Sequence, residues 1–453
     1  MEDNKSKSNI ISRLLPGIIA ELCAVITIII DYIMVAALGT AGVSAVAVCI
    51  HPTLFITGIF SVFITAAGVL IYGCISGEKR DEANGLFITA VKTVTAASVV
   101  IGLLIVVFAN QVIDFCAGQV DTHDMAVIYL KITVGCILLS NLLSLFNITL
   151  QRAGKARKVF AANLIYYIIN IVLDYFLITG KCGFPELGIK GAAIATVIAT
   201  AAALLFDIVI LFGDSNFVSI AYIFKNKIKG SMEYLGSIMN GFKKSISDTI
   251  LPRTGAFFTG VAAARMGSYE FAIYTVCDCL FEAAMAFGTA FKEAAEEFCE
   301  DLNDEEQQGN THPDKTGGYT KKLVMYGILA AFIIGGLMIL LAKPYCSLFC
   351  AEEEFLEIGF DACLFGAIAT LFMVPRMALS GLVDEGYTEK KLLSAGDICT
   401  GIVQPIACVV FVLILKEGIE GAHYAMVLAQ LIWLIIAVID LVSYRNNRIK
   451  SKE

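Results

Sequence analysis

Polar side chains that can together bind a cation lie within apolar runs of the first half of the sequence. Asp31 stands in the first run, Asp174 in the fifth and Thr196 in the sixth. Asp31 and Asp174 each lie about five or six residues outward of the middle of their runs, roughly 8–9 Å along a helix. Asn170 precedes Asp174 by four residues, so the two share a helix face. The sequence therefore predicts two carboxylates, an amide and a hydroxyl at similar depth.

This set of oxygen ligands suits a proton or a hard cation such as Na⁺. An ionisable group in the bilayer interior costs about 2.5–3.5 kcal/mol on insertion scales, which marks it as a functional candidate. Two carboxylates close together titrate as a coupled pair, so such a site can load a cation on one side of a membrane and release it on the other. A simpler alternative, in which each acid bonds to a neighbouring helix, stays open for the isolated Asp207 and Asp440.

The composition indicates the elements that must position these groups. The chain has 453 residues, of which 58% are hydrophobic and 16% charged, and its mean hydropathy is +0.78. Soluble domains have about 25% charged residues, so this chain has too little polar surface to cover itself in water. The net charge of −8 argues against a nucleic-acid partner, which would require a basic face. We therefore expect a polytopic membrane protein whose main surroundings are the lipid bilayer.

Apolar runs bounded by charged clusters predict twelve transmembrane helices. The predicted spans are 14–38, 46–73, 86–109, 125–150, 158–179, 187–212, 244–265, 269–297, 322–343, 357–380, 392–415 and 419–443. With these spans, 23 of the 33 Lys and Arg residues fall on one side of the membrane, five on the other and five within spans. By the positive-inside rule, both termini are cytoplasmic.

An internal repeat indicates two halves of the chain. Residues 188–192 read GIKGA and residues 418–422 read GIEGA, an offset close to half the length. Each half has six spans, so the two halves enter from the same side and form parallel repeats. We predict an N-terminal lobe at 1–213, a cytoplasmic linker at 214–240 and a C-terminal lobe at 241–453. Two six-helix lobes around a central cleft are typical of transporters.

The first half also resembles the multidrug and toxic compound extrusion (MATE) family, prokaryotic branch. Together the matching stretches cover most of residues 14–200 in the family's order. They are Asp31-Tyr32-Ile33-Met34-Val35 running into Leu38-Gly39, then Arg152-Ala153-Gly154, Asn170-Ile171-Val172-Leu173-Asp174, Gly183-Phe184-Pro185-Glu186-Leu187-Gly188 and Gly191-Ala192-Ala193-Ile194-Ala195-Thr196.

This resemblance implies a fold, an activity and site residues. It implies twelve helices in two lobes, export of organic cations by antiport against Na⁺ or H⁺, and a prokaryotic cell (plasma) membrane. By motif position, the family's coupling-cation site falls on Asp31, Asn170, Asp174 and Thr196. The proline at which the family's first span can bend falls on Pro16.

The second half departs from the family pattern. After the eighth span the family usually has a Gln and a Gly-rich loop, whereas residues 293–301 read EAAEEFCED. The repeat offset pairs Asp174 with Gln404, so the cation site is expected only once. Glu282 and Asp361 are the acids we select for a substrate cleft that binds an amphipathic organic cation. Aromatic and Met side chains can supply stacking and soft contacts.

Other functions are weighed against this one. The main alternative is a flippase for a lipid-linked saccharide or other lipid, whose cavity should be lined by Arg and Lys. A membrane enzyme would need a nucleophile–base or metal constellation, and the sequence shows none. A regulatory protein on a transporter scaffold is a third alternative. We expect no cofactor besides the coupling ion, no metal site and no obligate protein partner. Cys346 and Cys350 fall in one predicted outer loop, and nothing in the sequence decides between two thiols and a disulfide.

Overall fold

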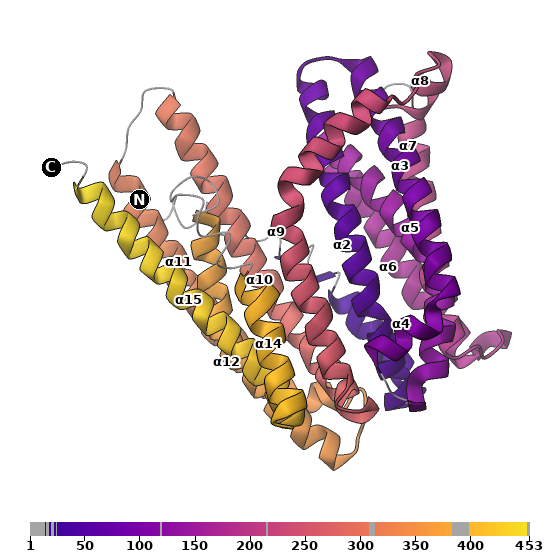
Figure 1. The fold of residues 1–453 in the computed structure, drawn as a ribbon, viewed down its shortest axis with the longest axis vertical. Coiled ribbons are helices and arrows are strands. Elements are labelled where there is room, and N and C mark those ends of the chain that lie inside the picture. Colours follow the sequence, from indigo (N-terminus) through magenta and orange to yellow (C-terminus); the bar gives the residue numbers. More distant parts are fainter. Residues whose placement is uncertain are drawn as a thin grey trace. The chain divides into compact units, whose positions relative to one another are not determined.

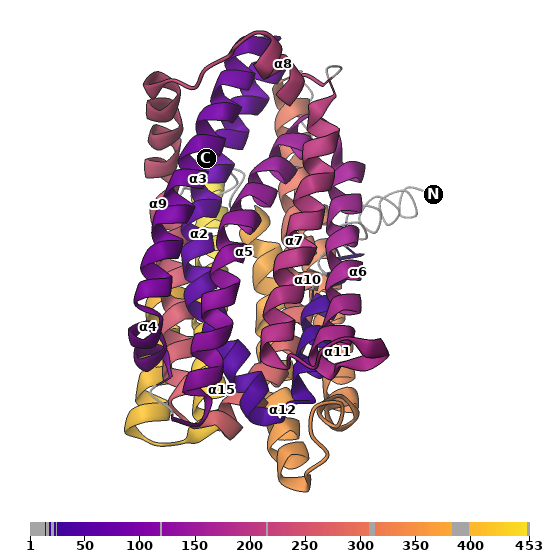
Figure 2. The same ribbon diagram turned by 90° about the vertical axis from the view of Figure 1, so that its right-hand side faces the viewer.

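The computed structural model describes residues 14, 18, 19, 22, 23, 25–117, 120–213, 216–307, 313–382 and 398–450, and these residues form an all-helical chain (Figures 1 and 2). A helical segment at 25–36 comes first. The remaining elements are α2 (Thr40–Ser76), α3 (Arg80–Val107), α4 (Ala109–Cys116), α5 (Val120–Arg152), α6 (Ala156–Thr179), η1 (Lys181–Gly183), α7 (Ile189–Phe212), α8 (Ile220–Lys225), α9 (Met232–Ala264), α10 (Ser268–Gln307), α11 (Pro313–Cys346), α12 (Glu353–Leu382), η3 (Cys399–Val403), α14 (Gln404–Cys408), η4 (Val409–Ile414) and α15 (Gly418–Lys450).

The predicted spans are confirmed as helices wherever the structure describes them. Nine of the described helices are long and apolar enough to cross a membrane, and 25–36 and 399–414 are shorter apolar segments. Helix α9 contains all of the predicted span 244–265 except its last residue. Large apolar side chains such as Val209 and Leu340 are more than two-thirds exposed on these helices, as expected of surfaces that face lipid.

Packing contacts divide the chain into two compact units. One comprises residues 33–268, and the other comprises 1–32 together with 269–453. Helix α9, which the repeat would place in the C-terminal lobe, packs along α2 and belongs to the first of these units. The predicted lobe boundaries describe the two copies of the repeat and not the compact units, so they stay a prediction.

Unit 33–268 is built on α2 and α5. Helix α2 packs against α5 and α9, and α7 packs against both α5 and α6. The long helices of this unit run alongside one another in both ribbon views (Figures 1 and 2). Its core includes Phe87 and Phe146, whose ring centroids lie 5.2 Å apart in an edge-on arrangement.

The predicted linker 214–240 contains helix α8 and the beginning of α9. It is tied to the start of α3, because the Arg80 guanidinium donates to the carbonyls of Asn216 and Phe217 and lies 3.8 Å from the centroid of the Tyr222 ring. The Asn84 side chain adds two hydrogen bonds: its amide nitrogen donates to the Phe217 carbonyl, and its oxygen accepts from the Ser219 backbone amide. These bonds hold the segment on its own compact unit.

The second unit has its core among α10, α11, α12 and α15. Helices α11 and α12 pack closely, and α12 also packs on α15. The segment 399–414 alternates between π-helical and α-helical turns around Pro405, which cannot donate a helical hydrogen bond. Pro16, the predicted helix-bending residue, lies outside the described residues.

Candidate functional site

The centre of the candidate cation site is a buried pair on one face of α6. The Asn170 amide Nδ2 donates to Asp174 Oδ2 at 2.8 Å, and the two residues are 0% and 2% exposed. A spacing of four residues puts both side chains on one helix face, one turn apart. Asn170 Oδ1 is buried and, among the described residues, has no hydrogen-bond partner. The pair therefore holds an amide oxygen in the same buried place as a carboxylate.

The turn between α6 and α7 brings a third oxygen to this level. Gly191 lets α7 approach α6 closely, because a Cβ there would lie 2.5 Å from the Leu177 carbonyl oxygen. From this point of contact, Asp174 lies three residues back along α6, about 4.5 Å, and Thr196 lies five residues forward along α7, about 7.5 Å. Because the two helices are antiparallel, both distances run in the same direction, and the two residues lie at similar depth. The Thr196 hydroxyl donates to the Ala192 carbonyl at 3.0 Å, so its lone pairs can still face a cation.

Asp31, the fourth predicted ligand, lies in the helical segment 25–36, where its side chain is half-buried next to the buried Tyr32. The boundary between the compact units falls directly after Tyr32, which places Asp31 in a different unit from Asn170, Asp174 and Thr196. The structure therefore brings Asn170 and Asp174 into contact, and the participation of Asp31 stays a prediction.

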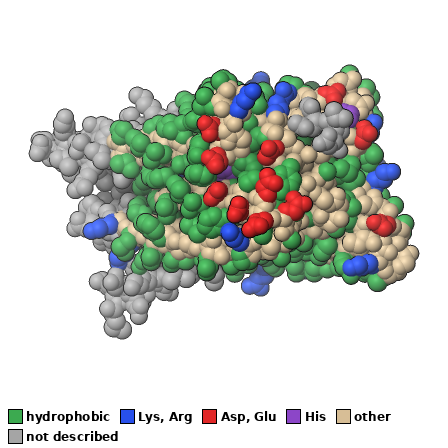
Figure 3. Space-filling model, turned by 90° about the horizontal axis from the view of Figure 1, so that it is seen from below, with side chains coloured by type: hydrophobic (Ala, Val, Ile, Leu, Met, Phe, Trp, Pro, Cys, Tyr) green, Lys and Arg blue, Asp and Glu red, His purple; other side chains and the backbone are tan. Residues whose placement is uncertain are grey.

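The two predicted cleft acids differ in their surroundings. Glu282 is half-buried on α10 and shares its helix face with Asp278, four residues earlier. Asp361 is exposed on α12. Glu352, Glu353, Glu354 and Glu357 are also exposed at the turn into α12, so this region is strongly acidic. On the face viewed in Figure 3, Asp and Glu side chains stand out from a mostly hydrophobic surface.

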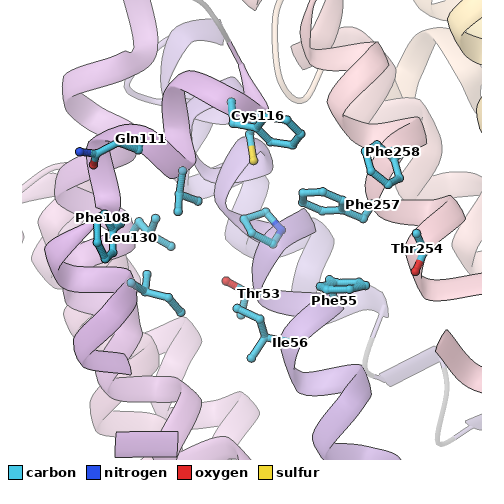
Figure 4. A pocket seen from close by; sticks show the side chains of 14 residues that line it. Thr53, Phe55, Ile56, Phe108, Gln111, Cys116, Leu130, Thr254, Phe257 and Phe258 are labelled. Atoms are coloured by element: carbon cyan, nitrogen blue, oxygen red, sulfur yellow. The ribbon is translucent and has the colours of Figure 1, made fainter. Parts of the chain in front are cut away.

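Sequence reasoning missed a cavity of about 610 Å³ within unit 33–268. It is lined by Pro52, Thr53, Phe55, Ile56, Ile105, Phe108, Gln111, Val112, Phe115, Cys116, Leu130, Thr254, Phe257 and Phe258 (Figure 4). None of these residues is charged, and their polar groups are two threonine hydroxyls, one amide and one thiol. A volume between 300 and 1,000 Å³ with few polar groups is typical of small-molecule sites.

Aromatic rings shape one wall of this cavity (Figure 4). The Phe257 ring centroid lies 5.5 Å from that of Phe55 and 6.2 Å from that of Phe115, and the latter pair is stacked. Phe258 meets Phe257 edge-on at 5.4 Å. Ring faces carry negative charge, so this wall can attract the apolar and cationic parts of a ligand without a carboxylate. The five Phe residues of the lining come from α2, α4, α9 and, for Phe108, the junction between α3 and α4. Because they are spread over distant segments, no local sequence motif predicts them.

Comparison with known proteins shows the fold and a family match over part of the chain. A solved structure described as the inward-facing conformation of a multidrug resistance MATE family transporter of the MOP superfamily shares 18% sequence identity with this chain. It superposes with a TM-score of 0.76 over 94% of both chains, which shows the fold. The MatE family model matches residues 16–176.

Two curated relatives are similar to this chain over parts of their length. The probable multidrug resistance protein YoeA of Bacillus subtilis is 25% identical over 71% of this chain and 68% of that protein. The probable multidrug resistance protein NorM of Thermotoga maritima is 28% identical, but the alignment spans only 30% of this chain and 28% of that protein. The MatE model's match includes Pro16, Asp31, Asn170 and Asp174, and it ends before Thr196.

Proposed function

We propose that this protein is a secondary active antiporter of the MatE family that exports amphipathic organic cations in exchange for Na⁺ or H⁺ by alternating access. In this proposal it lies in the cell membrane with both termini in the cytoplasm. The observation that carries the proposal is the buried Asn170–Asp174 pair, which lies in an apolar span and within the region that matches the family. The names of the curated relatives, which are multidrug resistance proteins, support the same class of activity.

The coupling step follows from the cost of burying charge. Asp174 is 2% exposed, so a negative charge there is costly and is offset when a cation or a proton neutralises the carboxylate. The Asn170 amide oxygen and the Thr196 hydroxyl supply neutral oxygen ligands, which suit Na⁺, whereas the carboxylate alone suffices for a proton. A cation that enters from outside neutralises the site and favours the conformation that releases the substrate outward. By reciprocity, substrate that binds from the cytoplasm favours release of the cation there.

The driving force suffices for such an exchange. One elementary charge that moves through 100 mV is worth about 2.3 kcal/mol, which corresponds to a concentration ratio of roughly 50-fold. An exchange that carries one net positive charge inward therefore sustains a useful outward gradient, whereas one-for-one exchange for a monovalent organic cation is electroneutral and is driven by the concentration gradient of the ion alone.

The cavity of unit 33–268 supports an aromatic, amphipathic substrate over a lipid-linked saccharide. Its five Phe rings favour stacking and cation–π contact, each worth about 0.5–2 kcal/mol. A flippase for pyrophosphate lipids needs basic groups in its cavity, and none of the 14 lining residues is Lys or Arg. The lining therefore favours drug-like cations.

The proposal is tested by ethidium accumulation in energised cells stripped of their own efflux pumps. Cells with the wild-type protein should retain less dye than empty cells, and Asp174→Asn should abolish the difference, because the amide cannot bind a proton or Na⁺ by charge. The matched control is Asp124→Asn, whose side chain is 99% exposed; it should export like wild type at equal expression. Phe257→Leu should raise the substrate concentration needed for half-maximal export and leave the coupling ion unchanged.

Proteoliposomes then identify the ion. Dye movement driven by an imposed Na⁺ gradient or by an imposed pH gradient supports antiport and names the coupling cation. If wild type retains as much of every organic cation tested as empty vesicles do, and neither gradient moves dye, the proposal is wrong. Lipid substrates would then become the first alternative to test.

A further inference from the structure

Three cysteine side chains that are far apart in the sequence meet inside the second compact unit. They are Cys277 of α10, Cys346 at the end of α11 and Cys363 of α12, and their sulfur atoms all lie within 4.8 Å of one another. Their exposed fractions are 2%, 0% and 1%. None of the thirteen cysteines that the structure describes, these three included, is in a disulfide. Cys346 therefore faces two thiols from neighbouring helices, and no disulfide joins it to Cys350.

The helices around this three-cysteine cluster are held by bonds to the backbone. The Cys277 thiol donates to the Gly359 carbonyl of α12 with a sulfur–oxygen distance of 3.5 Å. The Tyr345 hydroxyl, one residue before Cys346, donates to the Val276 carbonyl of α10 at 2.8 Å. A Cβ at position 359 would lie 2.6 Å from Cys346 Sγ, so glycine makes room for that sulfur. The three sulfurs are thus fixed by the packing of α10, α11 and α12.

We propose that Cys277, Cys346 and Cys363 bind a soft, singly charged metal ion, Cu(I). Thiolate ligands select soft ions such as Cu(I) and Zn²⁺ over hard ones. Three sulfurs at about 2.3 Å from a central ion, the length of a Zn–S bond, lie about 4 Å apart in a plane, which is within the observed separation. The site would close around an ion with small side-chain movements. It is independent of the proposed transport function.

Ligand number favours Cu(I) over Zn²⁺. Structural Zn²⁺ sites almost always have four ligands, whereas the described residues offer three His, Cys, Asp or Glu ligand atoms here. The thiolate, not the thiol, is the metal ligand. One proton therefore leaves to solvent for each of the three cysteines that binds the ion, and binding should weaken as the pH falls.

The experiment transfers Cu(I) from a coloured Cu(I) chelator to the purified full-length protein in detergent, without oxygen and without thiol reductants. Wild type should take up one equivalent more than Cys277→Ser, Cys346→Ser or Cys363→Ser. Affinity should fall by more than the roughly 10–100-fold loss that follows from changing an outer-shell partner. The matched control is Cys279→Ser, on the same helix, equally free and 5% exposed but outside the cluster; it should bind like wild type.

X-ray absorption on wild-type protein loaded with one equivalent of Cu(I) needs no variant. It therefore tests the proposed copper coordination even if a Ser substitution prevents folding. Three sulfur neighbours at about 2.3 Å support the proposal. The proposal is wrong if the three Ser variants bind Cu(I) as tightly as wild type, if Zn²⁺ displaces Cu(I) from the cluster, or if non-reducing mass spectrometry finds two of these cysteines joined as a disulfide.

Discussion

Two turns of the molecule, one in each compact unit, share the same backbone conformation and hydrogen-bond pattern. Gly188 precedes α7 with φ +55°, and Gly418 begins α15 with φ +57°. The amide just before each glycine bonds back to the preceding helical segment: Leu187 to the Leu177 carbonyl at 2.9 Å and Glu417 to the Phe411 carbonyl at 3.0 Å. Three residues on, Gly191 and Gly421 each pack against that same carbonyl-bearing residue. The repeated sequence thus has a repeated structural role.

The polar groups near these turns are not repeated. At the offset of 230 residues, Asn170 corresponds to Thr400, Asp174 to Gln404 and Thr196 to Met426. The second copy therefore retains the packing and lacks the carboxylate. This comparison teaches that the close approach of the two helices is a feature of the repeat itself, whereas the carboxylate of the proposed cation site is present in one copy only.

The sharpest test of this comparison changes the partner of the carboxylate in one copy and its counterpart in the other. Asn170→Ala removes the 2.8 Å bond to Asp174. It also removes the amide oxygen proposed to bind Na⁺. A hydrogen-bonding partner of a charged group contributes about 1.5–3 kcal/mol, so Na⁺ affinity should fall roughly 10–150-fold. Proton affinity should instead rise, because the lost N–H bond stabilised the ionised carboxylate. In either case the coupling-ion affinity changes. Thr400→Ala should leave it within about twofold. Ion dependence of dye export in proteoliposomes measures both, and an equal change in the two variants would contradict a single site.

Substitution of the close-approach glycines should affect both copies, but unequally. A Cβ at position 191 would lie 2.5 Å from a backbone carbonyl oxygen, whereas at position 421 the nearest atom is the Phe411 Cβ at 2.9 Å. Overpacking costs about 1–3 kcal/mol, and we expect Gly191→Ala near the upper limit and Gly421→Ala near the lower one. Thermal unfolding in detergent measures the difference.

The control for both is Gly236→Ala in α9, where a Cβ would meet nothing within 4 Å. Alanine in a helix interior is favoured over glycine by about 0.5–1 kcal/mol, so this variant should be slightly more stable than wild type. If Gly191→Ala unfolds at the wild-type temperature, the two helices do not meet as described.

The helices and one side-chain pair could be predicted because both depend on local sequence. An apolar run of about 20 residues crosses a bilayer as a helix, because a helix satisfies its own backbone hydrogen bonds where no water is present. This rule predicts the long apolar helices between α2 and α15. The contact of Asn170 with Asp174 follows from a spacing of four residues on one helix.

Features built from distant residues could not be predicted. Cys277, Cys346 and Cys363 come from three helices, so their spacing in the sequence carries no signature of a metal site. The same holds for the Phe-lined cavity and for the packing of α9 along α2, which a symmetric reading of the repeat assigns to the other lobe. These features depend on tertiary contacts between distant segments, which the hydrophobic periodicity of the sequence does not predict.

The glycines with positive φ should be required in both copies. Ala in left-handed backbone conformations costs about 1–2 kcal/mol, because its Cβ approaches the following carbonyl oxygen. Gly188→Ala and Gly418→Ala should therefore lower stability by similar amounts, and unlike the close-approach glycines they should not differ between the copies. Thermal unfolding of the two variants side by side measures this. A loss of stability in only one variant would show that the two turns do not share the same backbone conformation.

The smallest expected effect concerns Thr196, whose counterpart in the repeat is Met426. Thr196→Val keeps the shape and removes the hydroxyl, and a neutral hydrogen-bonding group contributes about 0.5–1.5 kcal/mol, so coupling-ion affinity should fall roughly 2–10-fold. Thr196→Ser should restore it, because the serine hydroxyl can also donate to the Ala192 carbonyl and accept a cation. Met426→Thr should gain nothing, since position 404 holds a neutral amide instead of a carboxylate. Ion titration of dye export compares the four proteins. Equal affinities for Val and Ser at position 196 would remove Thr196 from the site and leave the Asn170–Asp174 pair as its described part.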